Sequence, residues 1–151
     1  MRRRARELAL QVLFQLDVQP DLPVEAALSR FWGNFAEEVA EEAVGAGQAP
    51  ATGEALSEAR AYADNLVRGV ALHQAEIDAR ITSASRNWRL ERMARVDRNL
   101  LRLAVYEANF GGDVPAKAAI NEAIEIAKRF GAQETPAFVN GILDRVLTGR
   151  G

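Results

Sequence analysis

The residues best suited to chemistry in this sequence are arginines, and they open the chain. Four of the first six residues are arginines, namely Arg2, Arg3, Arg4 and Arg6. They lie at the start of a predicted helix, where the macrodipole disfavours cations, so an external anion would explain them. A guanidinium bonds phosphate through two hydrogen bonds and stacks on bases, which suits RNA. The alternative is a solvated terminus, and composition alone does not separate the two.

A second arginine-rich stretch spans residues 80–102, with seven arginines against Glu91 and Asp97. Trp88 lies within it and suits base stacking. A solvated helix face is the favoured interpretation, and a nucleic-acid surface is the alternative. The net charge of −2 indicates no general attraction to nucleic acid, so local clusters matter more than the total.

Residue types that carry catalysis are scarce. There is no cysteine and a single histidine, His73, which is expected to be structural or exposed. HExxH, Walker A, GxGxxG and GxSxG motifs are absent from the sequence. We therefore expect no enzyme, catalytic residue, metal or cofactor. No apolar run approaches the ~20 residues of a membrane span, so a cytoplasmic protein is expected.

The arginines must be positioned by helices, because no stretch alternates as a strand does. Apolar spacing predicts an all-α bundle of about seven helices in one domain, with halves at 1–82 and 83–151. The expected helices cover 3–18, a segment from Pro23, 57 to beyond 77, a short one ending near Ser85, 90–110, 115–131 and 135–147. Residues 45–55 are turn-rich and indicate a loop of unassigned role.

The last third, 113–147, predicts a helical hairpin. Pro115 begins its first helix, and Gly131 ends it as a C′ residue. Thr135 is the predicted N-cap of the second helix, with Pro136 in its first turn. Phe138 lies at the edge of the apolar face, where it is either core rim or a platform for a base.

Three side chains fit their helices poorly. Leu10 and Phe14 are four residues apart on the otherwise polar face of the first helix. They are either covered by another part of the chain or form an apolar patch for a partner protein. Asp97 projects into an apolar arc, where a carboxylate requires a partner.

Four segments together resemble the family of the transcription antitermination factor NusB. They are RRRARELALQVLFQLD (2–17), MARVDRNLLRLAVYE (93–107), DVPAKAAINEAIEIAKRFG (113–131) and FVNGILD (138–144). The resemblance implies an all-helical, non-enzymatic factor that binds boxA RNA of ribosomal RNA operons. It also implies a small-subunit ribosomal protein, NusE, as partner, and the RNA polymerase antitermination complex as the setting.

The resemblance also implies roles for particular residues. It places five residues near RNA, namely Arg2, Arg3, Arg6, Glu134 and Phe138. It places Phe14, with its neighbour Leu10, and Asp97 at the partner surface. The position of Asp97 equally allows an internal ion pair with an arginine. Two alternatives are a protein-only helical adaptor and a stand-alone relative of the RNA-recognition domain of ribosomal RNA cytosine methyltransferases. A homodimer that covers the apolar pair and the arginine face is a further hypothesis.

Overall fold

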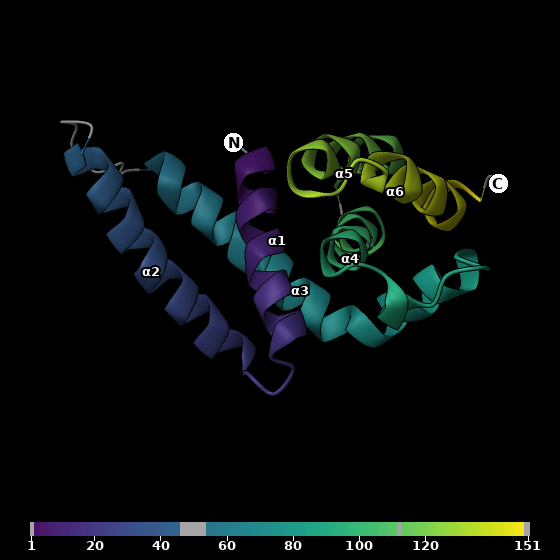
Figure 1. The fold of residues 1–151 in the computed structure, drawn as a ribbon, viewed down its shortest axis with the longest axis horizontal. Helices are drawn as coiled ribbons and strands as arrows, with labels where there is room; N and C mark the ends of the chain where they lie inside the picture. Colours follow the sequence, from purple (N-terminus) through teal and green to yellow (C-terminus); the bar gives the residue numbers. More distant parts are fainter. Residues whose placement is uncertain (1, 46–53, 112, 150–151) are drawn as a thin grey trace.

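The computed structural model describes residues 2–45, 54–111 and 113–149, with the side chains of 37–45 and 54–55 left aside. Within this part of the chain all regular structure is helical. The helices, arranged as in Figure 1, are α1 (Arg2–Val18), α2 (Val24–Gly45), α3 (Glu54–Ala84), α4 (Arg95–Asn109), α5 (Ala116–Phe130) and α6 (Thr135–Leu143), with a 3-10 turn η1 (Leu90–Arg92) and a π-helical turn η2 (Asp144–Thr148). The predicted all-α class is confirmed; the loop expected at 45–55 lies almost wholly outside the described residues.

Two of the predicted helix boundaries are wrong. The short helix expected to end near Ser85 is the last part of α3, which runs unbroken for 31 residues. The helix expected over 90–110 is interrupted, because Met93 and Ala94 have extended backbone. This break allows Leu90 and Met93 both to be buried. Arg98 donates to the carbonyl oxygens of Leu90 and Glu91 and thereby holds the turn against α4.

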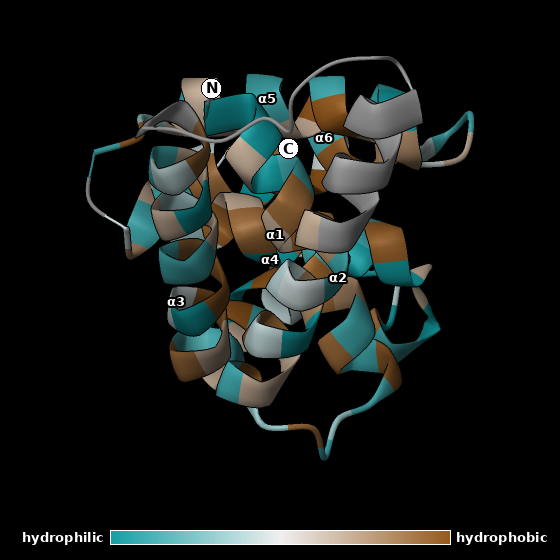
Figure 2. Cartoon of the chain, turned by 90° about the vertical axis from the view of Figure 1, so that its left-hand side faces the viewer, coloured by the Kyte–Doolittle hydropathy of each residue, from teal (hydrophilic) through white to brown (hydrophobic). Residues whose placement is uncertain are grey.

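Two hydrophobic clusters hold the helices together, and α1 contributes to both. One cluster joins α1, α2 and α3, and the other joins α4, α5 and α6 to the end of α3. In Figure 1, α1 lies between α2 and the group formed by α4, α5 and α6. Figure 2 shows that the outer side of α3 is mostly hydrophilic, as expected for an amphipathic helix. The division into halves at residue 82 stays a prediction.

Gly69 allows helices α3 and α4 to meet closely. A Cβ atom at this position would lie 2.1–2.4 Å from the ring of Tyr106 on α4. His73, one turn further along α3, stacks on Phe110 with ring centroids 4.8 Å apart. The single histidine therefore lies in an aromatic contact between α3 and α4, as the structural interpretation of His73 predicts.

Candidate nucleic-acid interface

The arginines at the start of α1 contact different helices, and Arg3 meets α5. Arg3 donates two hydrogen bonds, of 3.0 and 2.9 Å, to the carboxylate of Glu122. The side chain of Arg3 is still 50% exposed. The guanidinium of Arg2 lies 5.0 Å from the centre of the Tyr62 ring. Arg2 and Arg3 thus combine an internal contact with an accessible cationic surface.

Arg6 differs from its neighbours because it is buried. It donates hydrogen bonds of 2.6 and 3.0 Å to the carboxylate of Glu107 on α4. Tyr62 donates a further hydrogen bond of 2.6 Å to the same carboxylate. Only 7% of Arg6 is exposed, so the external anion that the sequence assigned to it is replaced here by an internal one. Its predicted contact with RNA stays a prediction, because the guanidinium is occupied by Glu107 in this structure.

The next residue of α1, Glu7, reaches the end of α5. Its carboxylate is 5% exposed and accepts two hydrogen bonds of 3.1 Å from Arg129. Arg3 therefore meets the middle of α5, and Glu7 meets its last turn. This arrangement brings the start of α1 and the α5–α6 turn to the same side of the molecule.

The α5–α6 turn is tightened by Gly131 and Thr135. A Cβ atom on Gly131 would lie 2.6 Å from side-chain carbons of Thr135, so close approach explains the glycine. Its backbone is extended (φ −93°), and it is the C-cap of α5, where the sequence predicted a C′ residue. Thr135 is the first residue of α6 and Glu134 precedes it as N-cap, so the predicted capping role of Thr135 is also wrong. The Thr135 hydroxyl instead accepts a hydrogen bond of 3.0 Å from the Ala132 amide.

Asp97 obtains its partner from this turn. Thr135 donates a hydrogen bond of 2.9 Å to its carboxylate, and no arginine of the described chain forms an ion pair with it. Burial raises the pKa of Asp97, and repulsion from Glu134 adds to this shift, although the Thr135 hydrogen bond opposes it. The negative charge of Asp97 therefore lowers the stability of the folded state.

Glu134 and Phe138 lie at the start of α6. Glu134 is exposed, and Phe138 is half-buried against the core of α4, α5 and α6. The exposed ring of Trp88 meets Phe138 edge-on, with centroids 5.5 Å apart. Phe138 therefore packs on the core while part of its ring remains accessible, and its role as a platform for a base stays a prediction.

Only one member of the predicted apolar pair on α1, Phe14, is exposed. Leu10 is 3% exposed and packs in the core of α4, α5 and α6, so the predicted patch with Leu10 is wrong. The reason is that α1 lies between two cores and is covered on both sides. Phe14 is 38% exposed and Val18, four residues later, is 44% exposed. These two residues form the apolar surface of α1 that is available to a partner.

Sequence reasoning missed a network beneath the second arginine stretch. Asp17 accepts hydrogen bonds of 2.6 and 2.5 Å from Arg98 and one of 2.7 Å from Asn99. Arg102 donates to Asp78 at 2.8 Å. Burial alone would raise the pKa of Asp17, but the bonds from Arg98 and Asn99 outweigh it and lower the pKa. Arg98 and Arg102 are therefore interior residues; Arg86, Arg89, Arg92 and Arg95 are exposed.

Other kinds of site find no support in the part of the chain that the structure describes. No cluster of His, Cys, Asp and Glu side chains there has the geometry to hold a metal ion. Among these same residues, no helix is long and apolar enough to cross a bilayer. The residues that stand out are arginines, an edge aromatic and an exposed apolar pair, which define a class of helical binding protein.

The particular family follows from comparison with known proteins. The model of the NusB family matches residues 3–148. The chain belongs to the NusB family. It is 49% identical to the transcription antitermination protein NusB of Anaeromyxobacter sp. (strain Fw109-5), covering 98% of this chain and 90% of that protein. It is 44% identical to the protein of that name from Myxococcus xanthus (strain DK1622), covering 96% and 93%.

Solved structures agree in fold. NusB of T. maritima has a TM-score of 0.77 and 34% identity, covering 98% of this chain and 91% of that one. A complex of antitermination factors NusB and NusE with double-stranded RNA has a TM-score of 0.71 and 26% identity, covering 99% and 97%. These full-length matches favour the antitermination family over both alternatives, the adaptor and the methyltransferase-associated domain.

Proposed function

We propose that this protein is a non-enzymatic transcription antitermination factor of the cytoplasm. It binds boxA-type RNA of ribosomal RNA operons together with the small-subunit ribosomal protein NusE, within the RNA polymerase antitermination complex. The observation that carries this proposal is the full-length similarity to a NusB chain whose structure contains NusE and RNA. The accessible arginines of α1 are consistent with it.

The proposed RNA site lies along α1, α5 and the start of α6. Arg2 and Arg3 bind phosphates, because their guanidiniums are accessible and suited to bidentate contacts. Phe138 offers a ring to an unstacked base, and Glu134 lies beside it at the start of α6. Arg6 acts indirectly, since its bond to Glu107 fixes the helix that carries Arg2 and Arg3.

The proposed partner surface consists of Phe14 and Asp97. Phe14 is an exposed aromatic residue beside exposed Val18, and such residues often dominate protein interfaces. Asp97 offers a carboxylate to a cation of the partner. A homodimer that covers Phe14 and Val18 competes with the partner in this proposal, and equilibrium sedimentation at micromolar concentrations tests it.

The decisive experiment is a salt titration of RNA binding with and without purified NusE. We expect boxA RNA to bind more tightly than a scrambled RNA, and the pair of proteins to bind more tightly than either alone. Each neutralised phosphate contributes ~0.7 to the slope of log affinity against log salt. Arg2→Ala with Arg3→Ala lowers the affinity and the slope without lowering the Tm. Absence of RNA binding under all conditions favours a protein-only adaptor.

A further inference from the structure

A surface between the end of α3 and the α6–η2 helix is not used by the contacts proposed above. The turn after α3 packs along this helix at two points. Trp88 meets Phe138 edge-on at 5.5 Å, and Arg145 donates a hydrogen bond of 3.4 Å to the carbonyl oxygen of Ala84. Trp88 is nevertheless 56% exposed. We call the region formed by Trp88, Arg86, Gly141 and Arg145 the Trp88 surface.

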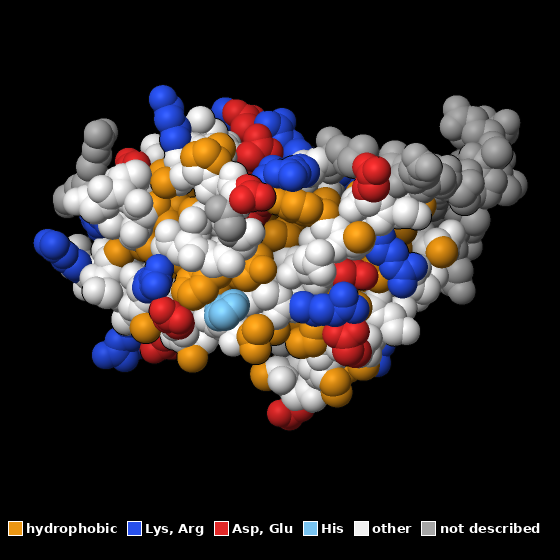
Figure 3. Space-filling view, turned by 180° about the vertical axis from the view of Figure 1, so that it is seen from behind, with side chains coloured by type: hydrophobic (Ala, Val, Ile, Leu, Met, Phe, Trp, Pro, Cys, Tyr) orange, Lys and Arg blue, Asp and Glu red, His pale blue; other side chains and the backbone are white. Residues whose placement is uncertain are grey.

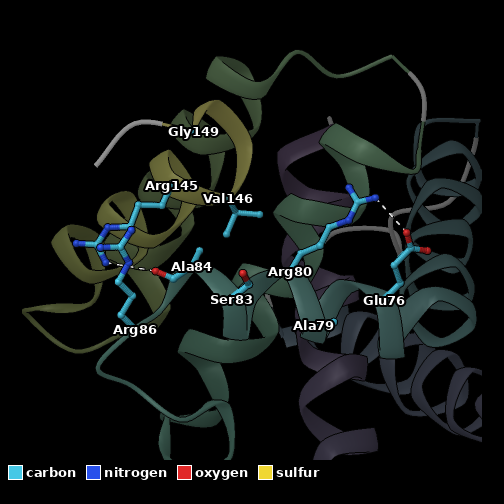
Figure 4. Close-up of a pocket in the computed structure, with 9 residues that line it drawn as sticks. All are labelled: Glu76, Ala79, Arg80, Ser83, Ala84, Arg86, Arg145, Val146 and Gly149. Atoms are coloured by element: carbon cyan, nitrogen blue, oxygen red, sulfur yellow. Dashed lines mark hydrogen bonds and ion pairs between the residues drawn. The ribbon is translucent and has the colours of Figure 1, made fainter.

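The Trp88 surface is basic. Arg86 and Arg145 line a cleft of ≈ 500 Å³ together with Ser83 and Gly149. Figure 4 shows the side chains of Arg86 and Arg145 extending next to each other at one end of this cleft. Within the described residues neither forms an ion pair, whereas Arg80 at the other end pairs with Glu76 at 3.0 Å. Basic side chains protrude around this end of the molecule, on the left in Figure 3.

Gly141 is the second independent feature of this region. It lies within α6, where glycine is less favourable than alanine. A Cβ atom on Gly141 would meet nothing within 4 Å, so packing within the chain does not require a glycine. Gly141 is three positions after Phe138 and four before Arg145, so the helix surface is open between the ring and the guanidinium.

An exposed indole, an open strip of helix and two guanidiniums without ion pairs in the described chain are the components of single-stranded nucleic-acid sites. Arginines bind phosphates, and an indole face stacks on any base. An acidic peptide would use the arginines but would give no role to the accessible indole. The edge-on contact of Trp88 with Phe138 makes the region continuous with the proposed RNA site.

We propose that the Trp88 surface binds the single-stranded RNA that flanks the boxA-type element. One base stacks on Trp88, and Arg86 and Arg145 hold a neighbouring phosphate. This inference rests on the proposed function, because it extends the same RNA beyond Phe138. It assigns a role to Arg86 of the second arginine stretch, in which Arg98 and Arg102 are bound to Asp17 and Asp78.

A direct test uses tryptophan fluorescence of the full chain and a uridine dodecamer, without NusE. Trp88 is exposed, whereas Trp32 is 6% exposed and donates a hydrogen bond to Asp64, so its emission serves as an internal reference. We expect the dodecamer to quench the Trp88 emission. The quenching requires several-fold more RNA in Arg86→Ala with Arg145→Ala, and in Gly141→Gln. Arg30→Ala and Gly33→Gln are matched controls, since Arg30 is exposed on α2 and Gly33 is another helical glycine with open space.

A second measurement separates this inference from the proposed function. Three RNAs are compared in the presence of NusE: the boxA core, and the core with six uridines added on the 5′ or the 3′ side. One extension raises the affinity of the wild type about tenfold, as expected for one stacked base and one phosphate contact. Gly141→Gln and the Arg86, Arg145 double variant lose this gain and bind the core as before.

The outcomes are distinct. If the core binds but neither extension adds affinity, or if the variants keep the gain, the Trp88 surface has no role in RNA binding. Binding of a polyglutamate peptide to the arginines, with no quenching by RNA, also overturns the inference and assigns the region to an acidic protein. If the core RNA does not bind at all, the proposed function fails, and the dodecamer titration still decides whether Trp88 stacks on a base.

Discussion

The guanidinium of Arg6 binds the carboxylate of Glu107 through hydrogen bonds of 2.6 and 3.0 Å, and both side chains are more than nine-tenths buried. This pair joins the first helix to α4 across 101 residues of sequence. It separates Arg6, which supports the fold, from Arg2, Arg3 and Arg4, whose side chains remain exposed.

Arg6→Ala is therefore expected to destabilise the protein. It leaves the Glu107 carboxylate buried without its cation, which costs ~3–5 kcal/mol for such a pair. Urea unfolding followed by circular dichroism measures this loss. The control is Arg2→Ala, whose free energy of unfolding should stay within ~0.5 kcal/mol of the wild type. Equal stability of the two variants would show that Arg6 is solvated in solution.

Phe14→Asp is expected to abolish capture of NusE and to leave the fold intact. Phe14 is 38% exposed, so a carboxylate at this position remains hydrated in the free protein but would be desolvated in an apolar interface. A pull-down with purified NusE measures capture, and a thermal melt measures the fold. Gln11→Asp is the matched control, because Gln11 is an exposed residue of α1 and receives the same charge. Normal capture by Phe14→Asp excludes this surface.

Asp97→Asn is expected to raise the Tm at pH 7. The pKa of Asp97 is raised in the folded state by burial, so its charge destabilises the fold above the usual carboxyl range. The stability of the wild type therefore falls as the pH rises through the folded pKa. At low pH, below about 4, the carboxyl is protonated, and the wild type and the variant are expected to have the same stability. Thr135→Val should act oppositely and lower the Tm at pH 7, because it removes the hydrogen bond that stabilises the charge.

The same Asp97→Asn variant is expected to capture NusE more weakly. A carboxylate kept at a cost to stability is typical of functional positions. Capture is measured at two salt concentrations, since an ion pair with the partner weakens as salt rises. A higher Tm together with unchanged capture at both concentrations would remove Asp97 from the partner surface.

Phe138→Leu is expected to distinguish the packing of Phe138 on the core from its stacking on an RNA base. Leucine keeps an apolar contact with the core but removes the ring, so the Tm falls by only a few degrees while RNA affinity falls by ~1–3 kcal/mol. Fluorescence anisotropy with boxA RNA and NusE measures the affinity. A loss of Tm without a loss of affinity would make Phe138 a packing residue alone.

Asp17→Asn is expected to lower stability in a pH-dependent way. The pKa of Asp17 is lowered by Arg98 and Asn99 against the effect of burial, so its contribution is present above the unfolded pKa. This contribution is lost as the pH falls through the folded pKa. We expect a loss of about 3 kcal/mol at pH 7 in urea unfolding curves, and this loss shrinks as the pH falls below the usual carboxyl range. A pH-independent difference would contradict the role of the charge.

The fold was predictable because its signals are local. Apolar spacing and Pro/Gly punctuation predict α1, α5 and α6 to within a few residues, since these signals depend on near neighbours in sequence. The errors occur where a contact with a residue distant in sequence determines the backbone conformation. The break at Met93 depends on the burial of Leu90 and on Arg98, and neither is visible in a single helical stretch.

The types of residue in the candidate site were predictable from the sequence, but their hydrogen-bond partners were not. The sequence indicates that the arginines require an anion, yet Glu107 lies 101 residues beyond Arg6 and Glu122 lies 119 beyond Arg3. The prediction that Leu10 is exposed is wrong for a related reason. It assumed one apolar face for a helix that is covered on two sides.

The bond between Arg3 and Glu122 has a consequence for ionic-strength measurements. When Arg3 turns to a phosphate, the Glu122 carboxylate loses one of its two cationic partners, keeps only the 3.3 Å contact with Arg6, and remains close to the nucleic acid. The positive charge delivered to the RNA is then smaller than the number of arginines engaged. The measured salt slope should lie below ~0.7 for each arginine, and Glu122→Gln should steepen it and increase binding to unrelated RNA.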